Sequence, residues 1–476
     1  CSRFERGERM ARQRFDNSPS PTGAGTAEEQ ARLLDRVEAR GVRFINLEFT
    51  DVVGMAKSVT IPAVELADCL ARGKWFDGSA LEGFARVAET DMYLRPDLAT
   101  YAEVPWGTAT DGEGDRVARL ICAVLMPDGQ RFAGDPRAML IAALDAAAAL
   151  GLRYEVSPEL EFFLLRESEG IARDPLPHDR GGYFDLSTDV AADVRREMVS
   201  ELGSMGIRVE SSHHEVAAGQ HELDFAPADA LAMADAMVTA RYAIKAIAQR
   251  HGLWATFLPK PFHGINGSGM HTHQQLTRMS DGANAFADPG DAQYALSALG
   301  RHFIAGQLAH APASCAIVAP LVNSYKRLVP GYEAPVMITW GRVNREALVR
   351  VPRVAGSAAH TLRVELRSPD PSCNPYLAFA VMLRAGLDGM AHNLPLPPPV
   401  EEGLYTLEEP ARLRRGIGIL PETLADALAA LQGDQVLLDA LGEQIAAWFI
   451  DAKTREWDEY RREVHPWELK RYLPMY

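Results

Sequence analysis

The sequence lacks any paired arrangement of cysteines. Its five cysteines in 476 residues follow no regular interval and no CxxC spacing, so we expect free thiols in a reducing cytoplasm rather than a disulfide framework. No run of about 18 apolar residues marks a membrane span. The formal charge of −15 disfavours a nucleic-acid or anionic-membrane surface. With 47% hydrophobic and 24% charged residues the composition is that of a soluble globular protein.

Two segments instead place only charged side chains at alternate positions. In an extended strand, alternate side chains point to the same face, so 159–161 and 363–367 each direct charges to one face and apolar side chains to the other. Buried carboxylates are costly unless they are paired. The pattern predicts strands backed by a core and fronted by an ionic cavity, although an exposed strand can alternate in the same way. The apolar partners are Leu160, Phe162, Val364 and Leu366.

A third segment predicts a hairpin that adds two more carboxylates. Residues 213–225 resemble two short strands around a turn at Gly219. Glu215 and Glu222 can therefore converge although they are seven positions apart. For the neighbouring His213 and His214, a purely structural role is the alternative reading.

A glycine loop at 266–270 leads into two histidines on one strand face, His271 and His273. Carboxylates with a single imidazole suit Mg²⁺ or Mn²⁺ far better than zinc. Five carboxylates are too many for one ion, and two metals near arginines indicate phosphoryl transfer. No Walker A, HRD or DFG motif is present, so a nucleotide would be held in another way. The candidate ligands are Glu159, Glu161, Glu215, Glu222, Glu365 and His271.

Local patterns predict a polar N-terminal tail at 1–26, then a helix at 26–39 and a strand from Val42 to a turn at Gly54. A domain boundary is expected in the turn-rich stretch 127–136, where Asp135 can cap a helix that has Pro136 at its first position. The further helices are expected at 137–150, 189–205, 227–250, 291–310, 374–393 and 424–461.

From about residue 43 to the C-terminus the chain resembles the glutamine synthetase family, type I, alpha-like subgroup. The resemblance implies an α+β fold, with a small β-grasp domain at 27–132 followed by a large catalytic domain at 133–476 whose curved antiparallel sheet forms a funnel. The segments that carry the resemblance are 49–51, 76–79, 266–271, 323–335 and 363–367.

The resemblance also implies roles for individual residues. Glu161, Glu215 and Glu222 match the ligands of one metal, and Glu159, His271 and Glu365 match those of a second. Asn266, Gly267, Arg327 and Arg367 match positions that hold glutamate. His273, Arg345, Arg350 and Arg363 match positions that contact phosphate or nucleotide, with Arg345 also placed in the catalytic set.

In this family ATP first converts the γ-carboxylate of glutamate to γ-glutamyl phosphate, and ammonia then displaces phosphate to give glutamine. Asp51 matches the aspartate that binds and deprotonates ammonium, and Glu333 matches a mobile glutamate that closes over the intermediate. The aspartate acts in a neighbouring subunit, which implies a ring assembly, typically a dodecamer of two stacked hexamers. Arg86 matches an arginine that senses glutamine in one subgroup, so Arg86→Ala should weaken inhibition by glutamine.

Two alternatives belong to other functional classes. A catalytically inactive relative would lack metal carboxylates, and none is missing. A sister ligase would join glutamate to a polyamine or another primary amine, and segments 229–233 and 368–374 resemble those relatives somewhat. Such ligases often alter the glycine loop or the Pro330-Gly331-Tyr332 sequence before the mobile glutamate. Both are intact, which favours ammonia.

Overall fold

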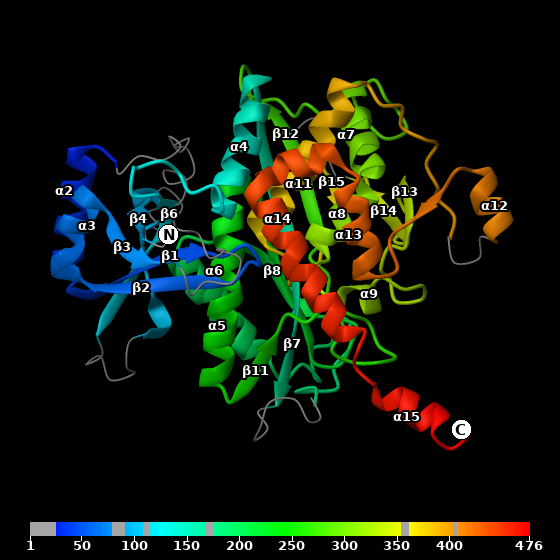
Figure 1. Ribbon diagram of the computed structural model, residues 1–476, viewed down its shortest axis with the longest axis horizontal. Coiled ribbons are helices and arrows are strands. Elements are labelled where there is room, and N and C mark those ends of the chain that lie inside the picture. The colour runs from blue at the N-terminus through cyan, green and yellow to red at the C-terminus, as the bar shows by residue number, and fades with distance from the viewer. Residues whose placement is uncertain (1–24, 79–90, 108–114, 167–175, 354–360, 404–407) are drawn as a thin grey trace.

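The computed structural model describes residues 25–78, 91–107, 115–166, 176–353, 361–403 and 408–476. Figure 1 shows a small N-terminal unit beside a much larger one that contains the rest of the chain. Residues 1–24 of the predicted tail and the predicted glutamine sensor Arg86 lie outside the described residues. Within the described ranges, no helix combines the length and apolar character needed to cross a bilayer.

The N-terminal unit is a six-stranded sheet with its own hydrophobic core. Thr26 caps the first helix through a reciprocal pair of hydrogen bonds with Glu29, which explains why the helix starts there. The strand order is β2-β1-β6-β4-β3, with β5 on β6, and β1 runs parallel to β6. The elements are α2 (Ala27–Ala39), β1 (Val42–Thr50), β2 (Ala56–Pro62), α3 (Leu66–Arg72), β3 (Lys74–Asp77), β4 (Asp91–Pro96), β5 (Ala102–Glu103) and β6 (Arg116–Leu125).

The large unit is built on a ten-stranded sheet with the order β16-β13-β14-β15-β12-β7-β9-β8, to which β10 and β11 add by pairing with β7. Its strands are β7 (Leu152–Arg166), β8 (Val209–His214), β9 (Gln220–Phe225), β10 (Ala228–Asp229), β11 (Leu253–Thr256), β12 (Thr272–Arg278), β13 (Met337–Gly341), β14 (Ala347–Arg350), β15 (Val364–Leu366) and β16 (Gly418–Ile419).

Helices cover the apolar face of this sheet and form one large core with it. As predicted, Leu160, Phe162, Val364 and Leu366 are buried, at 0 to 3% exposure. The helices are α4 (Pro136–Ala149), α5 (Ala192–Ser204), α6 (Ala230–Arg250), α7 (Ala298–Ala309), α8 (Ala311–Val318), α9 (Ser324–Arg327), α11 (Pro375–Ala391), α12 (Glu409–Arg414), α13 (Leu424–Gln432), α14 (Gln435–Tyr460) and α15 (Pro466–Tyr472).

The predicted antiparallel sheet is in fact mixed, because β13 and β14 run parallel. A segment of only five residues, 342–346, joins them. The Glu401 carboxylate, from a distant part of the chain, accepts hydrogen bonds from the amides of Arg342 and Val343 and holds this connection. The direction of β14 therefore depends on a contact that local patterns do not reveal.

The predicted helix at 424–461 is interrupted twice, since α13 ends at Gln432, α14 begins at Gln435, and α14 has a kink at Gly442, whose backbone is not helical. The first break occurs because the Asp434 side chain caps α14 by accepting from the amide of Leu437. The expected helix at 291–310 starts only at Ala298. Asp291 instead holds a turn by accepting from the amides of Gln293 and Leu296.

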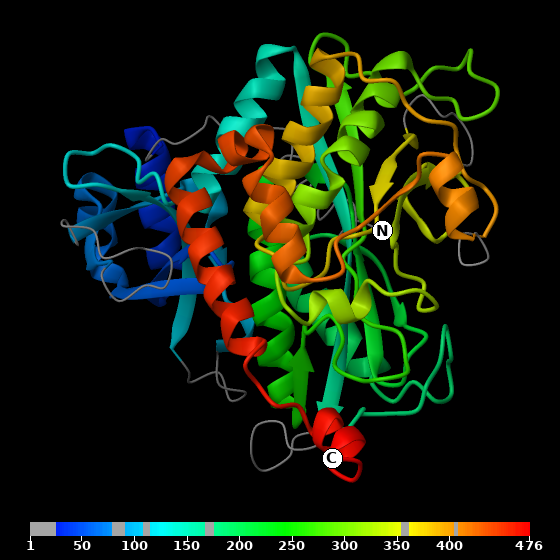
Figure 2. The ribbon, with the colours of Figure 1, turned by 45° about the vertical axis from the view of Figure 1, so that its right-hand side comes forward.

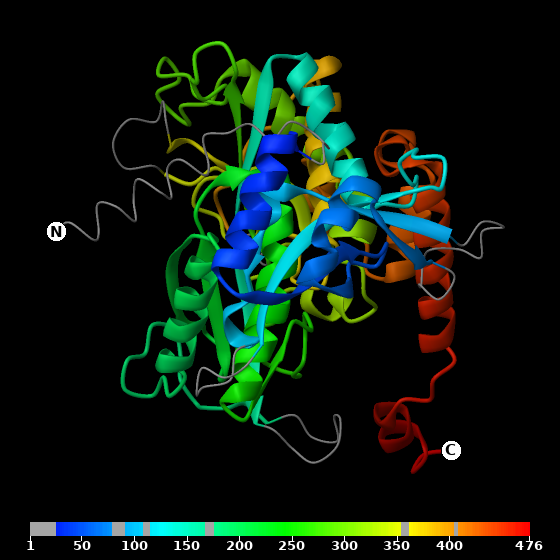
Figure 3. The same ribbon diagram turned by 90° about the vertical axis from the view of Figure 1, so that its left-hand side faces the viewer.

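The start of α4 agrees with the prediction, with Asp135 as cap and Pro136 in the first turn. Near it, α14 joins the two units, because Trp448 packs against both hydrophobic cores and its ring lies 5.9 Å from that of Phe132. Figure 2 shows α14 (red) between the N-terminal unit (blue) and the rest of the large unit. In Figure 3 the N-terminal sheet lies over the large unit, while α15 projects away from the body of the molecule.

Candidate active site

A cavity of about 660 Å³ opens on the polar face of the large sheet. Strands β7, β9, β14 and β15 contribute to its wall together with the glycine loop and the 332–334 segment. Most of the predicted site residues line it. They are Glu159, Glu161, Glu215, Glu222, Asn266, Gly267, His271, Arg327, Glu333, Arg345, Arg350, Glu365 and Arg367.

One cluster of metal-ligand type consists of Glu159, His271 and Glu365, each with a ligand atom within 4.8 Å of the others. Strand pairing explains this convergence, because β12 lies between β7 and β15 and the amide of Glu159 bonds to the carbonyl of His271. His273 on β12 is 2.8 Å from the second oxygen of Glu159. The imidazoles thus hold the Glu159 carboxylate from two sides.

A second cluster consists of His213, Glu215 and Glu222, again within 4.8 Å. Gly219 makes the turn between β8 and β9 in a left-handed conformation, with φ of +70°, and so brings Glu215 next to Glu222. His213 Nε2 lies 3.5 Å from Glu222 and the ring lines the cavity. His213 therefore faces the cavity, whereas His214 is buried behind the hairpin.

Glu161 connects these clusters and has few charged partners of its own. It sits opposite Glu222 in the β7–β9 register and accepts hydrogen bonds from Gln220 Nε2 and the amide of Gly269. Burial, and then repulsion from Glu215, raise the pKa of Glu161 to about 8. Burial and repulsion from Glu161 raise the pKa of Glu222 well above its usual range.

The donor set fits divalent metal ions of the Mg²⁺ or Mn²⁺ kind. Burial and mutual repulsion raise the pKa values of Glu161 and Glu222, and a bound divalent cation would oppose both effects by favouring the charged carboxylates. Burial, followed by repulsion from Arg367, lowers the pKa of His271 to about 4, so its imidazole is neutral at pH 7 as a metal ligand must be.

We expect the metal-free protein to lose stability as the pH rises from about 5 to 8. In this window folded Glu161 keeps a proton that the unfolded chain, with an ordinary carboxyl pKa of 4.5, has released. The free energy of unfolding therefore falls with increasing pH. Added Mn²⁺ replaces the proton and should raise the melting temperature more at pH 8 than at pH 6. Thermal unfolding followed by circular dichroism measures both, and equal stabilisation at the two pH values would contradict the prediction.

Arginines form the opposite, basic part of the wall. Arg350 Nε donates to Glu365 at 2.6 Å, and Arg367 Nε lies 3.7 Å from the same carboxylate. Arg327 is buried and donates to the carbonyls of Arg367, Ser368 and Pro369. These contacts fix guanidinium groups at the cavity, where they suit carboxylate or phosphate.

The loop needs glycine at positions 267 and 269, because neighbouring atoms lie too close to leave room for a side chain. A Cβ atom at Gly269 would lie 2.5 Å from Arg327 Nη2, and one at Gly267 would lie 2.3 Å from the carbonyl oxygen of Pro259. Either side chain would displace the backbone or Arg327. Gly267 and Gly269 therefore allow the loop to pack closely against Arg327 and the Pro259 carbonyl.

Glu333 has a left-handed backbone, with φ of +56°, which costs a non-glycine residue free energy and is commonest at functional sites. Arg367 donates to its carbonyl oxygen, and the ring of the adjacent Tyr332 lies under Lys260 Nζ, 3.7 Å from the centroid. The 332–334 segment is thus held at the mouth by contacts on both sides, with Glu333 lining the cavity.

Three predicted residues do not line this cavity in the described part of the chain. His273 reaches it only through Glu159, and Arg363 lies near Ser157, with Nη1 3.4 Å from its hydroxyl. The Asp51 side chain is 1% exposed and lies 3.3 Å from Lys57, between the two units. It is not part of the cavity of its own chain.

The structure adds lining residues that the sequence analysis missed. Tyr183 and Phe184 stack at 3.9 Å and meet the ring of His213 edge-on. They lie in a loop, where no periodic pattern marks them. Gln220 bridges Glu161 and the carbonyl of Gly267. Only the position of Gln220 could have predicted this, because it is two residues before Glu222 on a predicted strand and so shares a face with it.

Comparisons with known proteins identify the family of the chain. A family model described as the glutamine synthetase catalytic domain matches residues 133–472, and one described as the glutamine synthetase beta-grasp domain matches 41–127. Glutamine synthetase of Thermus thermophilus is 49% identical over 94% of this chain and 99% of its own length. That of Halobacterium salinarum is 48% identical over 96% and 99%. A solved structure of a GmaS/ADP complex superposes with a TM-score of 0.82 at 33% identity, covering 93% of this chain and 99% of that one.

Proposed function

The chain belongs to the glutamine synthetase family, and from this we propose that its cavity joins ammonia to the γ-carboxylate of L-glutamate at the expense of ATP. The products are L-glutamine, ADP and phosphate, formed through γ-glutamyl phosphate. The observation that carries the proposal is the convergence of seven carboxylates, two histidines and four arginines on one cavity. We propose a β-grasp domain at 27–132 and a catalytic domain at 133–476, and the family matches at 41–127 and 133–472 support this division.

We assign Glu159, His271 and Glu365, which form one cluster, to one metal ion. We assign Glu215 and Glu222, which cluster with His213, to another, together with Glu161, which pairs with Glu222 across β7 and β9. When bound, Mg²⁺ or Mn²⁺ neutralises charge on the phosphoryl group that is transferred. The protein side chains bind and orient the reactants around it. Arg345 and Arg350 are proposed to contact phosphate, with His273 and Arg363 along the same face of the sheet.

Glutamate is proposed to bind at Asn266, Gly267, Arg327 and Arg367. The carbonyl contacts of Arg327 and Arg367 orient their guanidinium groups before glutamate arrives, which lowers the entropy cost of binding it. Glu333, at the mouth, is proposed to close over the intermediate and exclude water, which would otherwise hydrolyse the acyl phosphate.

The alternative acceptor is a polyamine or another primary amine. The two segments that suggest it make structural contacts outside the cavity lining. Asp229 caps α6, and Asn374 donates to the carbonyls of Asp51 and Val52. Neither residue lines the cavity. We therefore keep ammonia as the proposed acceptor.

The direct test supplies glutamate, ammonium, MgATP and the purified full chain, and measures glutamine by chromatography together with ADP. Equal amounts of glutamine and ADP are expected. ADP formation without glutamine in the presence of ammonium would contradict the proposed reaction.

We further propose a ring assembly, a dodecamer of two stacked hexamers, in which Asp51 serves the cavity of a neighbouring subunit. This role agrees with the exclusion of Asp51 from its own cavity. Mixing inactive Asp51→Ala subunits with inactive Glu365→Ala subunits should then restore part of the activity, because some hybrid interfaces contain both intact groups. Refolded mixtures are assayed against each variant refolded alone. No recovery in mixed rings, or an active monomer by light scattering, refutes the assembly.

A further inference from the structure

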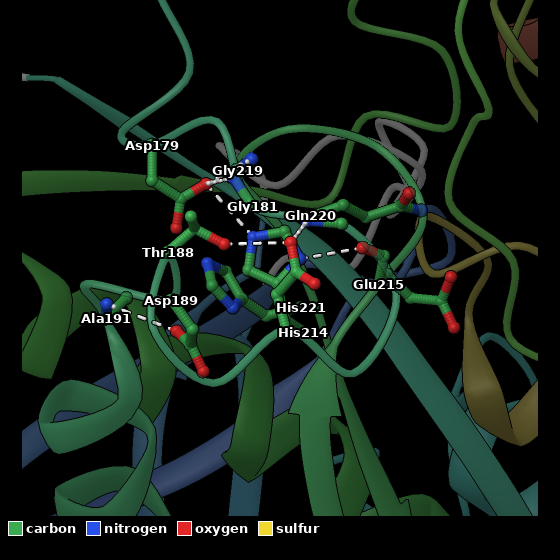
Figure 4. Close-up of polar contacts among 12 residues, drawn as sticks. Asp179, Gly181, Thr188, Asp189, Ala191, His214, Glu215, Gly219, Gln220 and His221 are labelled. Atoms are coloured by element: carbon green, nitrogen blue, oxygen red, sulfur yellow. Dashed lines mark hydrogen bonds and ion pairs between the residues drawn. The ribbon is translucent and has the colours of Figure 1, made fainter.

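A buried ionic network lies behind the β8–β9 hairpin, on the side of β9 that faces away from the cavity (Figure 4). None of its side chains is more than 7% exposed. It joins the loop at 178–191, the start of α5 and both strands of the hairpin. Its members are Asp179, Asp189, Arg195, His214 and His221.

Asp179 is the centre of the network. One of its oxygens, Oδ1, accepts from the amide of Gly219 at 2.8 Å and from that of Gly181 at 3.3 Å, and lies 3.0 Å from His214 Nε2. Burial alone raises the pKa of Asp179, but the hydrogen bonds from His214 and Gly219 outweigh it and lower the pKa to about 2. The carboxylate is therefore charged and bound directly to the turn of the hairpin.

His214 connects Asp179 to the backbone of a cavity residue. Its Nδ1 lies 2.7 Å from the carbonyl oxygen of Glu215 and donates to it, because a carbonyl can only accept. The His214 imidazole also packs directly against the backbone of Gly181, so a side chain at position 181 would collide with it. A methyl group at Gly181 would lie 2.7 Å from His214 Nε2.

The second half of the network supports His221. Arg195 makes two hydrogen bonds to Asp189 and donates to His221 Nδ1 at 2.9 Å. Burial and the Arg195 charge lower the pKa of His221 to about 3, so the ring is neutral. His221 separates Gln220 from Glu222 on β9, and these two point to the cavity.

The cluster has the composition of a metal site, since Asp179, His214 and His221 offer ligand atoms within 4.8 Å of one another. The guanidinium group of Arg195 argues against that reading because it already binds His221 Nδ1. Each carboxylate also has its own partner, Arg195 for Asp189 and His214 for Asp179. The network therefore needs no further cation.

We propose that Asp179 is a positioning residue, which through Gly219 and His214 holds the hairpin so that Glu215 and Glu222 can bind a divalent metal ion together. The inference rests on the proposed function, because it takes these two carboxylates as ligands. Outer groups that orient metal ligands commonly change metal affinity by 10- to 100-fold when they are removed.

The test measures Mn²⁺ binding to the metal-free full-length protein by electron paramagnetic resonance of free Mn²⁺, independently of activity. Asp179→Asn should raise the dissociation constant of one class of Mn²⁺ sites, the same class that Glu222→Gln affects, about tenfold or more. The matched control is Asp235→Asn, which removes the charge from another buried ion pair, that of Arg137 and Asp235. Asp235 does not line the cavity, so its variant should lose thermal stability with metal affinity unchanged within about twofold.

Two further variants keep the test decisive. If Asp179→Asn does not fold, Gly181→Ala displaces His214 while leaving every charge in place and should weaken Mn²⁺ binding in the same direction. Glu222→Gln reports on the metal site itself. If Glu222→Gln weakens Mn²⁺ binding but folded Asp179→Asn and Gly181→Ala do not, the positioning role is overturned and the site stands. If Glu222→Gln leaves Mn²⁺ binding unchanged, the proposed metal site fails.

Discussion

Glu365→Ala should abolish phosphoryl transfer, with a loss of about a hundredfold or more in turnover. Glu365 is 1% exposed and lies between Arg350 and the Glu159–His271 pair, so its removal takes away a proposed metal ligand and leaves Arg350 without its carboxylate partner. Loss of one such group in a dry site costs ~3 kcal/mol or more of transition-state stabilisation. The measurement is glutamate-dependent ADP formation at saturating metal.

A matched control separates this effect from general damage to the fold. Glu48→Gln alters another buried carboxylate, in the N-terminal sheet, where it accepts from Tyr242. It should retain turnover within a few-fold even if its melting temperature falls. Near-normal turnover in a folded Glu365→Ala variant would remove Glu365 from the metal site.

Asp51→Ala should lose mainly amide synthesis, by about a hundredfold or more, while bound glutamate is still phosphorylated slowly. Ammonium has no lone pair until it gives up a proton, and a positioned base contributes roughly 10² to 10⁴ to such a step. Burial raises the pKa of Asp51, while the Met55 amide and Lys57 counteract it. The carboxylate is thus held as an acceptor for a proton. Glutamine formation and ADP formation are measured in parallel on the same sample.

The same experiment identifies the acceptor. Ammonium should have a higher specificity constant than methylamine, ethanolamine, putrescine or spermidine at matched pH and metal. The reason is that the 329–333 segment keeps the sequence expected of an ammonia-using enzyme. A preference for spermidine or ethanolamine would instead identify a sister ligase with the same phosphoryl chemistry.

Equal loss of glutamine formation and ADP formation in Asp51→Ala would contradict the role of Asp51 as the base.

Much of the candidate site could be predicted from the sequence, because strand periodicity is local. Alternation in 159–161 and 363–367 directs charges to one face whatever the rest of the chain does, and the turn at Gly219 makes Glu215 and Glu222 neighbours. The cap at Asp135 was equally predictable, since it acts on the amide of Arg137, two residues away. Similarity of long motifs then indicated the family.

The sequence by itself therefore determined the strands, the faces that carry charge and the metal-ligand chemistry. Only the tertiary structure decided which groups meet: that His213 joins Glu222, that Tyr183 and Phe184 line the mouth, and that Asp51 lies outside its own cavity. The parallel direction of β14 and the network around Asp179 belong to the same category. The physical reason is that these features depend on hydrogen bonds and packing between residues tens or hundreds of positions apart, which no local pattern encodes.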